Sequence, residues 1–322
     1  MAQQTSTVAA PRRRGHLIDL VLLVLVNMMF GAQYPATKTA VTEMGPVLLS
    51  VLTFGLAGLC MTPFFIWESR HHPNQPPILN LFRGHNLFPF MMATVAGYFP
   101  ASVVLAWGID RSLASNAALL TLTIPVNTAL LASIVRQERM NVWRWLSFGL
   151  AITGAIISSD IDWHSLNVAG KGFLLGNVLI LTACWGSAFT NVYSKGLLEQ
   201  YQPVRLLMAS YFVTALVCLP LLFWLERPHW STFGGFSAHT WAGLGILGFF
   251  SWGLAMILFF RVLSRLEVTQ VSLSIYLIPV FGISLAALFL HERISASIII
   301  GGLLALAGTS LILLADNSEV SV

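Results

Sequence analysis

One long stretch of this chain occurs twice, and this duplication limits the possible folds more than any other feature of the sequence. Residues 115–154 read SNAALLTLTIPVNTALLASIVRQERMNVWRWLSFGLAITG, and residues 269–308 read TQVSLSIYLIPVFGISLAALFLHERISASIIIGGLLALAG. Aligned without a gap, Pro125 meets Pro279, at a constant offset of 154 residues. Each copy has an apolar segment with an internal proline, a Glu-Arg pair and a second apolar segment. Such a duplication is typical of membrane proteins built from two repeats.

The composition places most of the chain in lipid. Of its residues, 56% are hydrophobic and only 9% are charged, with a mean hydropathy of +0.77, whereas a soluble domain carries about 25% charged residues. The net charge of +4 comes mainly from arginines in short loops, which report membrane orientation. No basic face with groove-reading elements is evident, so no nucleic-acid partner is predicted.

Apolar runs of about 20 residues predict ten transmembrane helices and an all-α integral membrane protein. The predicted spans are 17–39, 46–67, 87–108, 113–135, 142–159, 172–194, 204–225, 240–260, 268–290 and 295–314. The basic residues before the first span resemble a secretory signal. We reject this alternative because the apolar run continues to Ala40 and has a counterpart in the second half.

The lysines and arginines predict the orientation. With the N-terminus inside, twelve of them lie in cytoplasmic segments and five in outer segments, which favours two cytoplasmic termini in the inner (plasma) membrane. Five helices per half is an odd number, so the two halves are predicted to be inverted repeats. The predicted organisation is a tail over 1–15, repeats over 16–165 and 166–315, and a tail over 316–322.

Further paired features extend the repeat. Phe30-Gly31-Ala32 matches Trp185-Gly186-Ser187, and Lys38 and Lys195 end these two spans, although Tyr193 aligns with Lys38 without a gap. With the prolines, the Glu-Arg pairs and the glycines late in both copies, residues 16–315 resemble the ten-helix EamA-type members of the drug/metabolite transporter superfamily. This resemblance implies a secondary transporter, often an exporter of amino acids or related metabolites. It also implies a cavity lined by the first, third, fourth, sixth, eighth and ninth helices.

Polar residues inside the spans are the candidate site, because they avoid lipid and face the bundle interior. Helical spacing places Asn27, Tyr34 and Lys38 on one face. The predicted substrate-binding residues are Asn27, Tyr34, Lys38, Tyr98, Asn116, Asn127, Thr182, Asn191, Trp252 and Gln270. Amides and hydroxyls would bind a polar solute, with aromatic rings as walls. The alternatives remain open: asparagines that tie helices together, and a Lys38 that either binds a carboxylate or reaches the interface.

Two further pairs of repeated residues are expected to have structural roles. Pro125 and Pro279 each remove a helix hydrogen bond, which predicts a kink and a candidate hinge. The glutamates of Glu138-Arg139 and Glu292-Arg293 precede helices, so they are expected to cap them and to bind no substrate. No acidic residue lies deep in a span, so the coupling ion, with a proton as one candidate, stays open.

The predicted function is secondary transport of a small polar metabolite, an amino acid or related compound, by alternating access and in the direction of export. The alternatives are a receptor or scaffold without transport, and an exporter of amphipathic drugs or nucleobase-like solutes. No enzyme is predicted, because neither a nucleophile elbow nor an HExxH motif occurs. The three cysteines lack metal or disulfide spacing, so no cofactor is expected. The expected partners are a small molecule and the bilayer, and the chain is a monomer or a homodimer.

Overall fold

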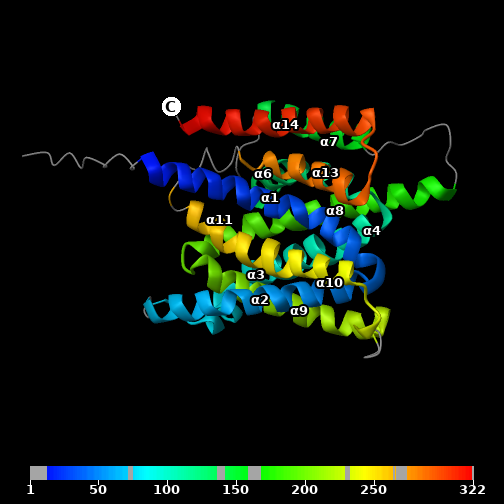
Figure 1. Cartoon of the computed structure of the whole chain (residues 1–322). Helices are drawn as coiled ribbons and strands as arrows, with labels where there is room; N and C mark the ends of the chain where they lie inside the picture. The colour runs from blue at the N-terminus through cyan, green and yellow to red at the C-terminus, as the bar shows by residue number, and fades with distance from the viewer. Residues whose placement is uncertain are drawn as a thin grey trace, which may run out of the picture.

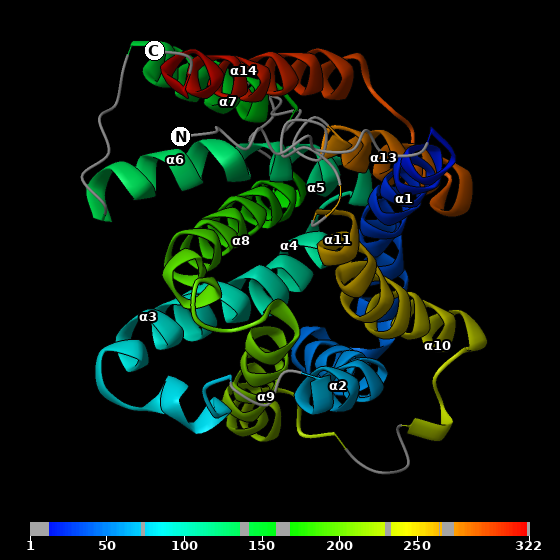
Figure 2. The same ribbon diagram turned by 90° about the vertical axis from the view of Figure 1, so that its left-hand side faces the viewer.

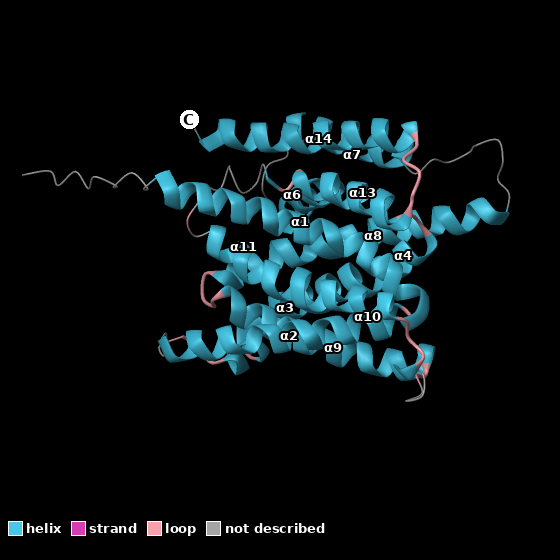
Figure 3. Cartoon of the chain, in the orientation of Figure 1, coloured by secondary structure: helices cyan, strands magenta, loops and turns pink. Residues whose placement is uncertain are grey.

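The computed structural model describes residues 13–71, 75–135, 142–158, 168–228, 233–263, 265 and 274–320. Within these ranges every regular element is a helix (Figures 1 and 3). The all-helical prediction is therefore confirmed. The helices run roughly along one axis, and α1 begins on the same side of the molecule where α14 ends (Figure 1).

The first half contains long helices and several shorter segments that join into longer rods. Its elements are α1 (Arg13–Met44), α2 (Pro46–His71), η1 (Ile78–Phe82), η2 (Gly84–Asn86), α3 (Leu87–Met91), η3 (Met92–Tyr98), η4 (Pro100–Val104), α4 (Leu105–Arg111), α5 (Ala114–Leu120), η5 (Thr121–Thr123), α6 (Ile124–Val135) and α7 (Val142–Ser158). The elements α3, η3, η4 and α4 follow one another almost without a break and form one rod.

The second half has a similar order of elements. They are α8 (Val168–Leu198), α9 (Pro203–Leu221), η6 (Leu222–Glu226), α10 (Ala238–Gly245), η8 (Ile246–Leu254), α11 (Ala255–Leu263), α13 (Leu277–Leu290) and α14 (Ala296–Val320). The elements α10, η8 and α11 form a rod that corresponds to α3–α4 in the first half.

Among the described residues, seven helical rods are long and apolar enough to cross a membrane. They are Ile18–Met44, Pro46–His71, Gly84–Arg111, Ala114–Val135, Phe173–Leu198, Pro203–Glu226 and Ala238–Val262. Three shorter apolar helices cover Trp145–Gly154, Leu277–Leu290 and Ala296–Gly308. Each predicted span thus has a helix at its place, while the count of ten membrane crossings stays a prediction.

The contact between α7 and α14 shows how the two halves are related. A Cβ on Gly154 would lie 2.5 Å from the Gly301 carbonyl oxygen and 2.6 Å from the Ala305 nitrogen. A Cβ on Gly308 would lie 2.8 Å from the carbonyl oxygen of Ser147. Ser147 and Gly301 are themselves repeat equivalents at the offset of 154 residues, so one contact maps onto the other. Because later residues of each helix meet earlier residues of the other, the helices are antiparallel, as inverted repeats require.

The rods α2 and α9–η6 pack in the same antiparallel way. At one end, the amide of Val47 donates to Glu226; at the other, Arg205 donates to Ser69 Oγ at 3.3 Å. We call the first end, where α2, α5 and α10 begin, the capped end (right-hand side of Figure 1). The opposite end, where α1 begins and α11 ends, is the cleft end, which faces the viewer in Figure 2.

Two pairs of rods depart from regular α-helix at equivalent places. The turn η5 (Thr121–Thr123) separates α5 from α6 directly before Pro125, and the turn residues Ile275 and Tyr276 precede α13, which contains Pro279. Both prolines thus follow residues that depart from the regular α-helix, while the kink and the hinge stay predictions. In addition, η3 and η8 are π-helical and start at residues 92 and 246, which are also repeat equivalents. π-Helical segments are rare and are frequent at functional sites.

Candidate functional site

Three carboxylates close the capped end by accepting hydrogen bonds at the starts of three helices. Glu226 accepts from the amides of Val47 and Leu48 in α2, both at 2.8 Å. At Gly45, with φ 79°, a Cβ would lie 2.8 Å from the Glu226 carboxylate, so only glycine fits this link without strain. A carboxylate at a helix start satisfies free amides and complements the helix dipole.

The same arrangement recurs at α5 and α10. Glu292 accepts from the amides of Ala114 and Ser115, at 2.8 and 2.9 Å. Glu43 accepts from the amide of Ser237 at 2.8 Å and from the hydroxyl of Thr240 at 2.7 Å. Each carboxylate comes from a different part of the chain than the helix it caps, so the caps hold separate helices together at this end.

The expectation that Glu292 caps the helix after it is wrong. Its carboxylate points to α5, while α14 is capped by Ser295, whose Oγ accepts from the amide of Ile298 at 3.2 Å. His291 adopts φ 55° at the end of α13, and Glu292 follows this turn of the backbone. Glu138 and Arg139 lie outside the described residues.

Lys38 fastens a fourth helix at the capped end. Its Nζ donates to the carbonyls of Ile109, Asp110 and Ser112, at 2.9, 2.8 and 2.8 Å. An ammonium has three donors, so these carbonyls use all of them. A cation at the end of α4 also complements the helix dipole. In this conformation Lys38 ties α1 to the end of α4, and its ammonium group has no free donor for a solute.

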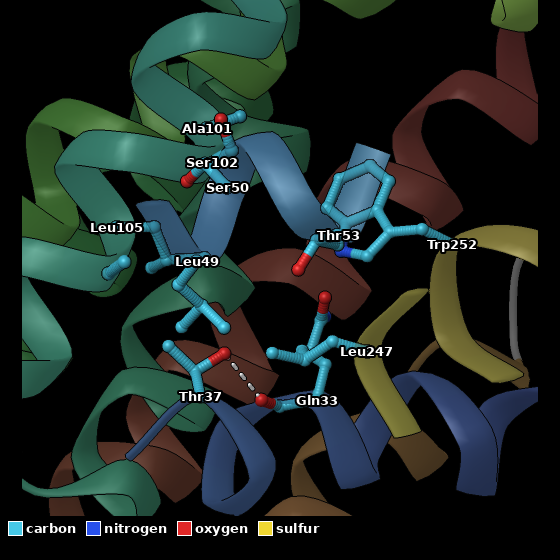
Figure 4. Close-up of a pocket in the computed structure, with 11 residues that line it drawn as sticks. Gln33, Thr37, Leu49, Ser50, Thr53, Ala101, Ser102, Leu105, Leu247 and Trp252 are labelled. Carbon is cyan, nitrogen blue, oxygen red and sulfur yellow. Dashed lines mark hydrogen bonds between the residues drawn. The ribbon is translucent and has the colours of Figure 1, made fainter. Parts of the chain in front are cut away.

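A small pocket with five hydroxyl or amide side chains in its lining lies toward the capped end, and we call it the polar pocket. Figure 4 shows its lining residues in close-up. Its lining residues are Gln33, Thr37, Leu49, Ser50, Thr53, Ala101, Ser102, Leu105, Ala106, Leu247 and Trp252. None of these residues is ionisable. The volume of about 30 Å³ holds only water molecules. Thr53 lines this pocket and is buried, and its Oγ1 has no hydrogen-bond partner among the described residues.

A much larger cleft at the opposite end is lined by residues of α2, α9, η8 and α11. Figure 2 shows how α2, α9 and α11 are arranged at this end. Its volume is about 940 Å³, which is within the range of small-molecule sites. It is lined by Pro63, Phe64, Trp67, Glu68, Gln202, Pro203, Val204, Leu254, Ile257, Leu258, Phe260, Arg261 and Arg265. The cleft is therefore mostly apolar, and its charged lining residues are Glu68, Arg261 and Arg265.

Four aromatic rings lie between the pocket and the cleft. Trp252 contacts Phe54, Tyr211 and Tyr98, with ring centroids 5.4, 6.0 and 6.3 Å apart. Phe54 and Tyr98 also contact Tyr211, at 4.9 and 5.8 Å. Tyr98 and Trp252 are repeat equivalents, and each lies in the C-terminal part of a π-helical segment. The two predicted residues thus meet where the halves of the molecule face each other. We call these four residues the aromatic cluster.

The other predicted residues of the first half are bonded between helices. Asn27 donates to Ser274 Oγ at 2.9 Å and to the Leu23 carbonyl at 2.8 Å, which favours its helix-tying alternative. Tyr34 is hydrogen-bonded to Thr121 Oγ1 at 2.8 Å, at the break before Pro125.

Two predicted asparagines are buried in the rod from α5 to α6. Asn116 donates to Asn177 Oδ1 at 2.6 Å. Its own Oδ1 and the Nδ2 of Asn177 have no partner among the described residues. Asn127 is buried in α6.

The predicted residues of α8 do not reach the polar pocket. Thr182 is exposed, and its hydroxyl donates to the Val178 carbonyl of its own helix at 2.9 Å. Asn191 is exposed and donates to Thr128 Oγ1 at 3.2 Å. Gln270 lies outside the described residues. Of the predicted residues in the described ranges, Trp252 lines the pocket, and the ring of Tyr98 packs against the indole of Trp252.

Several pocket residues were not among the predicted ones. Gln33 and Thr37 share a face of α1, and Ser50 and Thr53 share a face of α2 at a spacing of three residues. The sequence analysis names no candidate in the second span, although two hydroxyl residues one turn apart are a usable signal there.

These features are those of a polytopic membrane transporter: two sets of helices in antiparallel contact, irregular helix at equivalent places, and a cleft at the end opposite the carboxylate caps. A model of the EamA-like transporter family matches residues 17–159 and 174–314. The chain belongs to the EamA-like transporter family, within the drug/metabolite transporter superfamily, and is a transporter rather than an enzyme.

Relatives and a solved structure agree with this assignment. The chain is 26% identical over 296 residues to a "Probable terminal-alkyne amino-acid exporter" of Streptantibioticus cattleyicolor, covering 90% of this chain and 91% of the relative. It is 26% identical over 309 residues to a "Probable amino-acid metabolite efflux pump" of Salmonella typhimurium, covering 90% and 93%. A solved structure described as "Crystal structure of protein" superposes with a TM-score of 0.59 at 17% identity, covering 92% of this chain and 98% of that one. This last likeness concerns the fold.

Proposed function

We propose that this protein exports a small amino-acid-like metabolite across the plasma membrane by alternating access, with the cleft end in the cytoplasm. The observation that carries the proposal is the difference between the two ends. Three carboxylates and Lys38 fasten the capped end, whereas the cleft of about 940 Å³ opens the other. This conformation would take up solute from the cytoplasm.

The inverted repeats make a second conformation possible that keeps the contact between α7 and α14. Because the α7–α14 contact maps onto itself when the repeats are exchanged, each repeat can adopt the arrangement that the other has here. Exchanging the two arrangements would close the cleft end and open the capped end. A solute held near the middle would then face the outer solution.

The pocket and the relatives together support the substrate class. Hydroxyl and amide groups, including the unpartnered Thr53 Oγ1, suit the polar groups of a small metabolite, and the rings of the aromatic cluster suit its apolar part. The two relatives described above are named as exporters of amino-acid compounds. The cytoplasmic position of the cleft end rests on the excess of lysine and arginine in that half of the loops.

Counterflow in proteoliposomes tests the proposal. Vesicles are loaded with one unlabelled solute from a panel of amino acids, amino-acid derivatives, amines, nucleobases and sugar phosphates, and the entry of trace label is followed. We expect saturable exchange for amino-acid-like solutes. An imposed pH gradient that drives accumulation would identify a proton as the coupling ion.

A matched pair of variants on α2 connects transport to the pocket. Thr53→Val removes the unpartnered hydroxyl, whereas Thr62→Val removes a hydroxyl that donates to the Gly58 carbonyl and lies outside the pocket. We expect Thr53→Val to raise KM by roughly five- to twenty-fold, as the loss of one hydrogen bond predicts, and Thr62→Val to leave it unchanged. Exchange confined to nucleobases or amphipathic drugs, or equal effects of both variants, would contradict the proposal.

A further inference from the structure

We propose that the aromatic cluster is the barrier that a solute must pass between the cleft and the polar pocket, and that the Tyr211–Trp252 hydrogen bond is its latch. That a solute passes this barrier rests on the proposed function, whereas the ring contacts and the hydrogen bond are features of the structure. It assigns a role in closing the path between the two spaces to Phe54 and Tyr211, which line neither of them.

The position of the cluster follows from its neighbours. The four rings belong to one apolar group that also contains Val204, Ile257 and Phe260, and these three residues line the cleft. Trp252 belongs to the same group and lines the pocket. One continuous apolar layer therefore separates the two spaces, with the pocket on one side and the cleft on the other.

The distance along α2 agrees with this position. Thr53 lines the pocket, Phe54 belongs to the cluster, and Pro63 is the first α2 residue on the cleft. At a rise of about 1.5 Å per residue, the pocket and cleft positions on α2 lie about 15 Å apart. Rings at centroid distances of 4.9 to 6.3 Å fill this interval and leave a solute no path unless at least one of them moves.

The latch joins a side chain to an irregular stretch of backbone. The hydroxyl of Tyr211 donates to the backbone carbonyl of Trp252 at 3.1 Å, and this carbonyl belongs to the π-helical segment η8. The bond therefore connects α9 with the rod that carries Trp252. Moving the indole away from Tyr211 with its helix would break the bond, and restoring it would close the barrier again.

Thiol labelling tests the barrier without any transport measurement. In a variant whose three native cysteines are replaced, Ser102→Cys places a reporter in the pocket. The purified protein in detergent is treated with a small charged methanethiosulfonate reagent, and the labelling rate is measured. We expect slow labelling of the parent, because the capped end and the cluster both exclude the reagent.

Two variants separate the rings from the latch. Trp252→Ala removes three ring contacts and is expected to accelerate labelling roughly ten-fold or more. Tyr211→Phe keeps the ring and removes only the hydrogen bond, so an acceleration of about three- to ten-fold is expected. Trp224→Ala, at an indole that is 69% exposed in η6, is the control and should leave the rate unchanged.

The outcomes distinguish this inference from the proposed function. If both cluster variants fold, shown by an unchanged elution volume, and neither accelerates labelling, the barrier lies elsewhere and the inference is wrong. If Trp252→Ala does not fold, Tyr211→Phe alone decides the question. Faster labelling without counterflow of any solute would keep the barrier and contradict the transport proposal. Counterflow with unchanged labelling would support the transport proposal and contradict the barrier.

Discussion

At the scale of single residues, the capped end is held by charges that serve helix termini. Glu226 and Glu292 each accept two backbone amides at the start of a helix that comes much earlier in the chain. Lys38 donates to three carbonyls at the end of α4. These are charge-assisted hydrogen bonds, which are about twice as strong as neutral ones. They are also reversible, because the termini they leave can be solvated at the membrane surface.

Lys38→Met tests whether this lysine is structural or binds the solute. The variant keeps the aliphatic stem and removes three hydrogen bonds, so we expect the free energy of unfolding to fall by about 2 kcal/mol. Thermal unfolding in detergent measures the change. Lys195→Met, at the exposed lysine of α8, should leave stability unchanged. Unchanged stability of Lys38→Met, with a higher KM for carboxylate solutes only, would instead favour the substrate-binding alternative.

The sequence predicted the burial of several polar side chains better than it predicted their partners. Asn27, Tyr34 and Asn116 are buried as expected for polar residues in a span. Each finds its hydrogen bond on a neighbouring helix, and that choice depends on helix rotation and contact distance rather than on periodicity. Glu292 shows the same limit, because the helix it caps is distant in sequence.

At the scale of helices, the glycines of α7 and α14 decide how closely these helices approach. Gly154 and Gly308 lie against the backbone of the opposite helix, and small residues are what allows membrane helices to pack closely. The duplication in the sequence already marked both glycines as repeat equivalents. The sequence does not show that both glycines lie in one contact, which depends on how α7 and α14 cross in the structure.

Gly154→Ala and Gly308→Ala test this contact. The added methyl groups would lie 2.5 Å and 2.8 Å from backbone oxygens, so each variant is expected to lose about 1–3 kcal/mol of stability. Gly149→Ala is the matched control on α7, because a Cβ there meets nothing within 4 Å. It should change stability by less than about 1 kcal/mol, in the stabilising direction. Equal thermal midpoints for all three variants would show that the contact does not stabilise the protein.

Two kinds of irregular helix differ in how far the sequence predicts them. The interruptions before Pro125 and in front of Pro279 follow from the missing amide of proline, and both were expected. The π-helical segments η3 and η8 were not, because no single residue type marks them. Tyr98 and Trp252 lie in these segments and contact each other across distant parts of the chain, and such a contact is not visible in the sequence.

At the scale of the molecule, parity and duplication were enough to predict inversion. Five predicted spans per half would reverse the second repeat, and the antiparallel contact of α7 with α14 agrees with such a reversal. The residues that fasten the capped end are only partly duplicated: Glu138 is the equivalent of Glu292, whereas Tyr193 stands in the position of Lys38. Which end is closed is a property of the conformation, set by which of two similar sets of contacts is formed.

Exchange of the two ends can be measured as distances between spin labels. With the native cysteines replaced, one pair is placed at the cleft end, on Arg70 and Arg261, and another at the capped end, on Thr42 and Arg227. All four positions are exposed. Adding a solute that shows counterflow is expected to shorten the first distance and lengthen the second, each by on the order of a helical turn, about 5 Å.

The two changes must occur together, because one repeat takes up the arrangement that the other gives up. A third pair on Val142 and Leu303 provides the control: both side chains are exposed, and their helices are held by the contact of Gly154 and Gly308. This distance should stay constant in every condition. If solute narrows the cleft end while the capped end keeps its distance, the protein has a single gate rather than two exchanging ones. The two repeats would then share a fold without exchanging their conformations during transport.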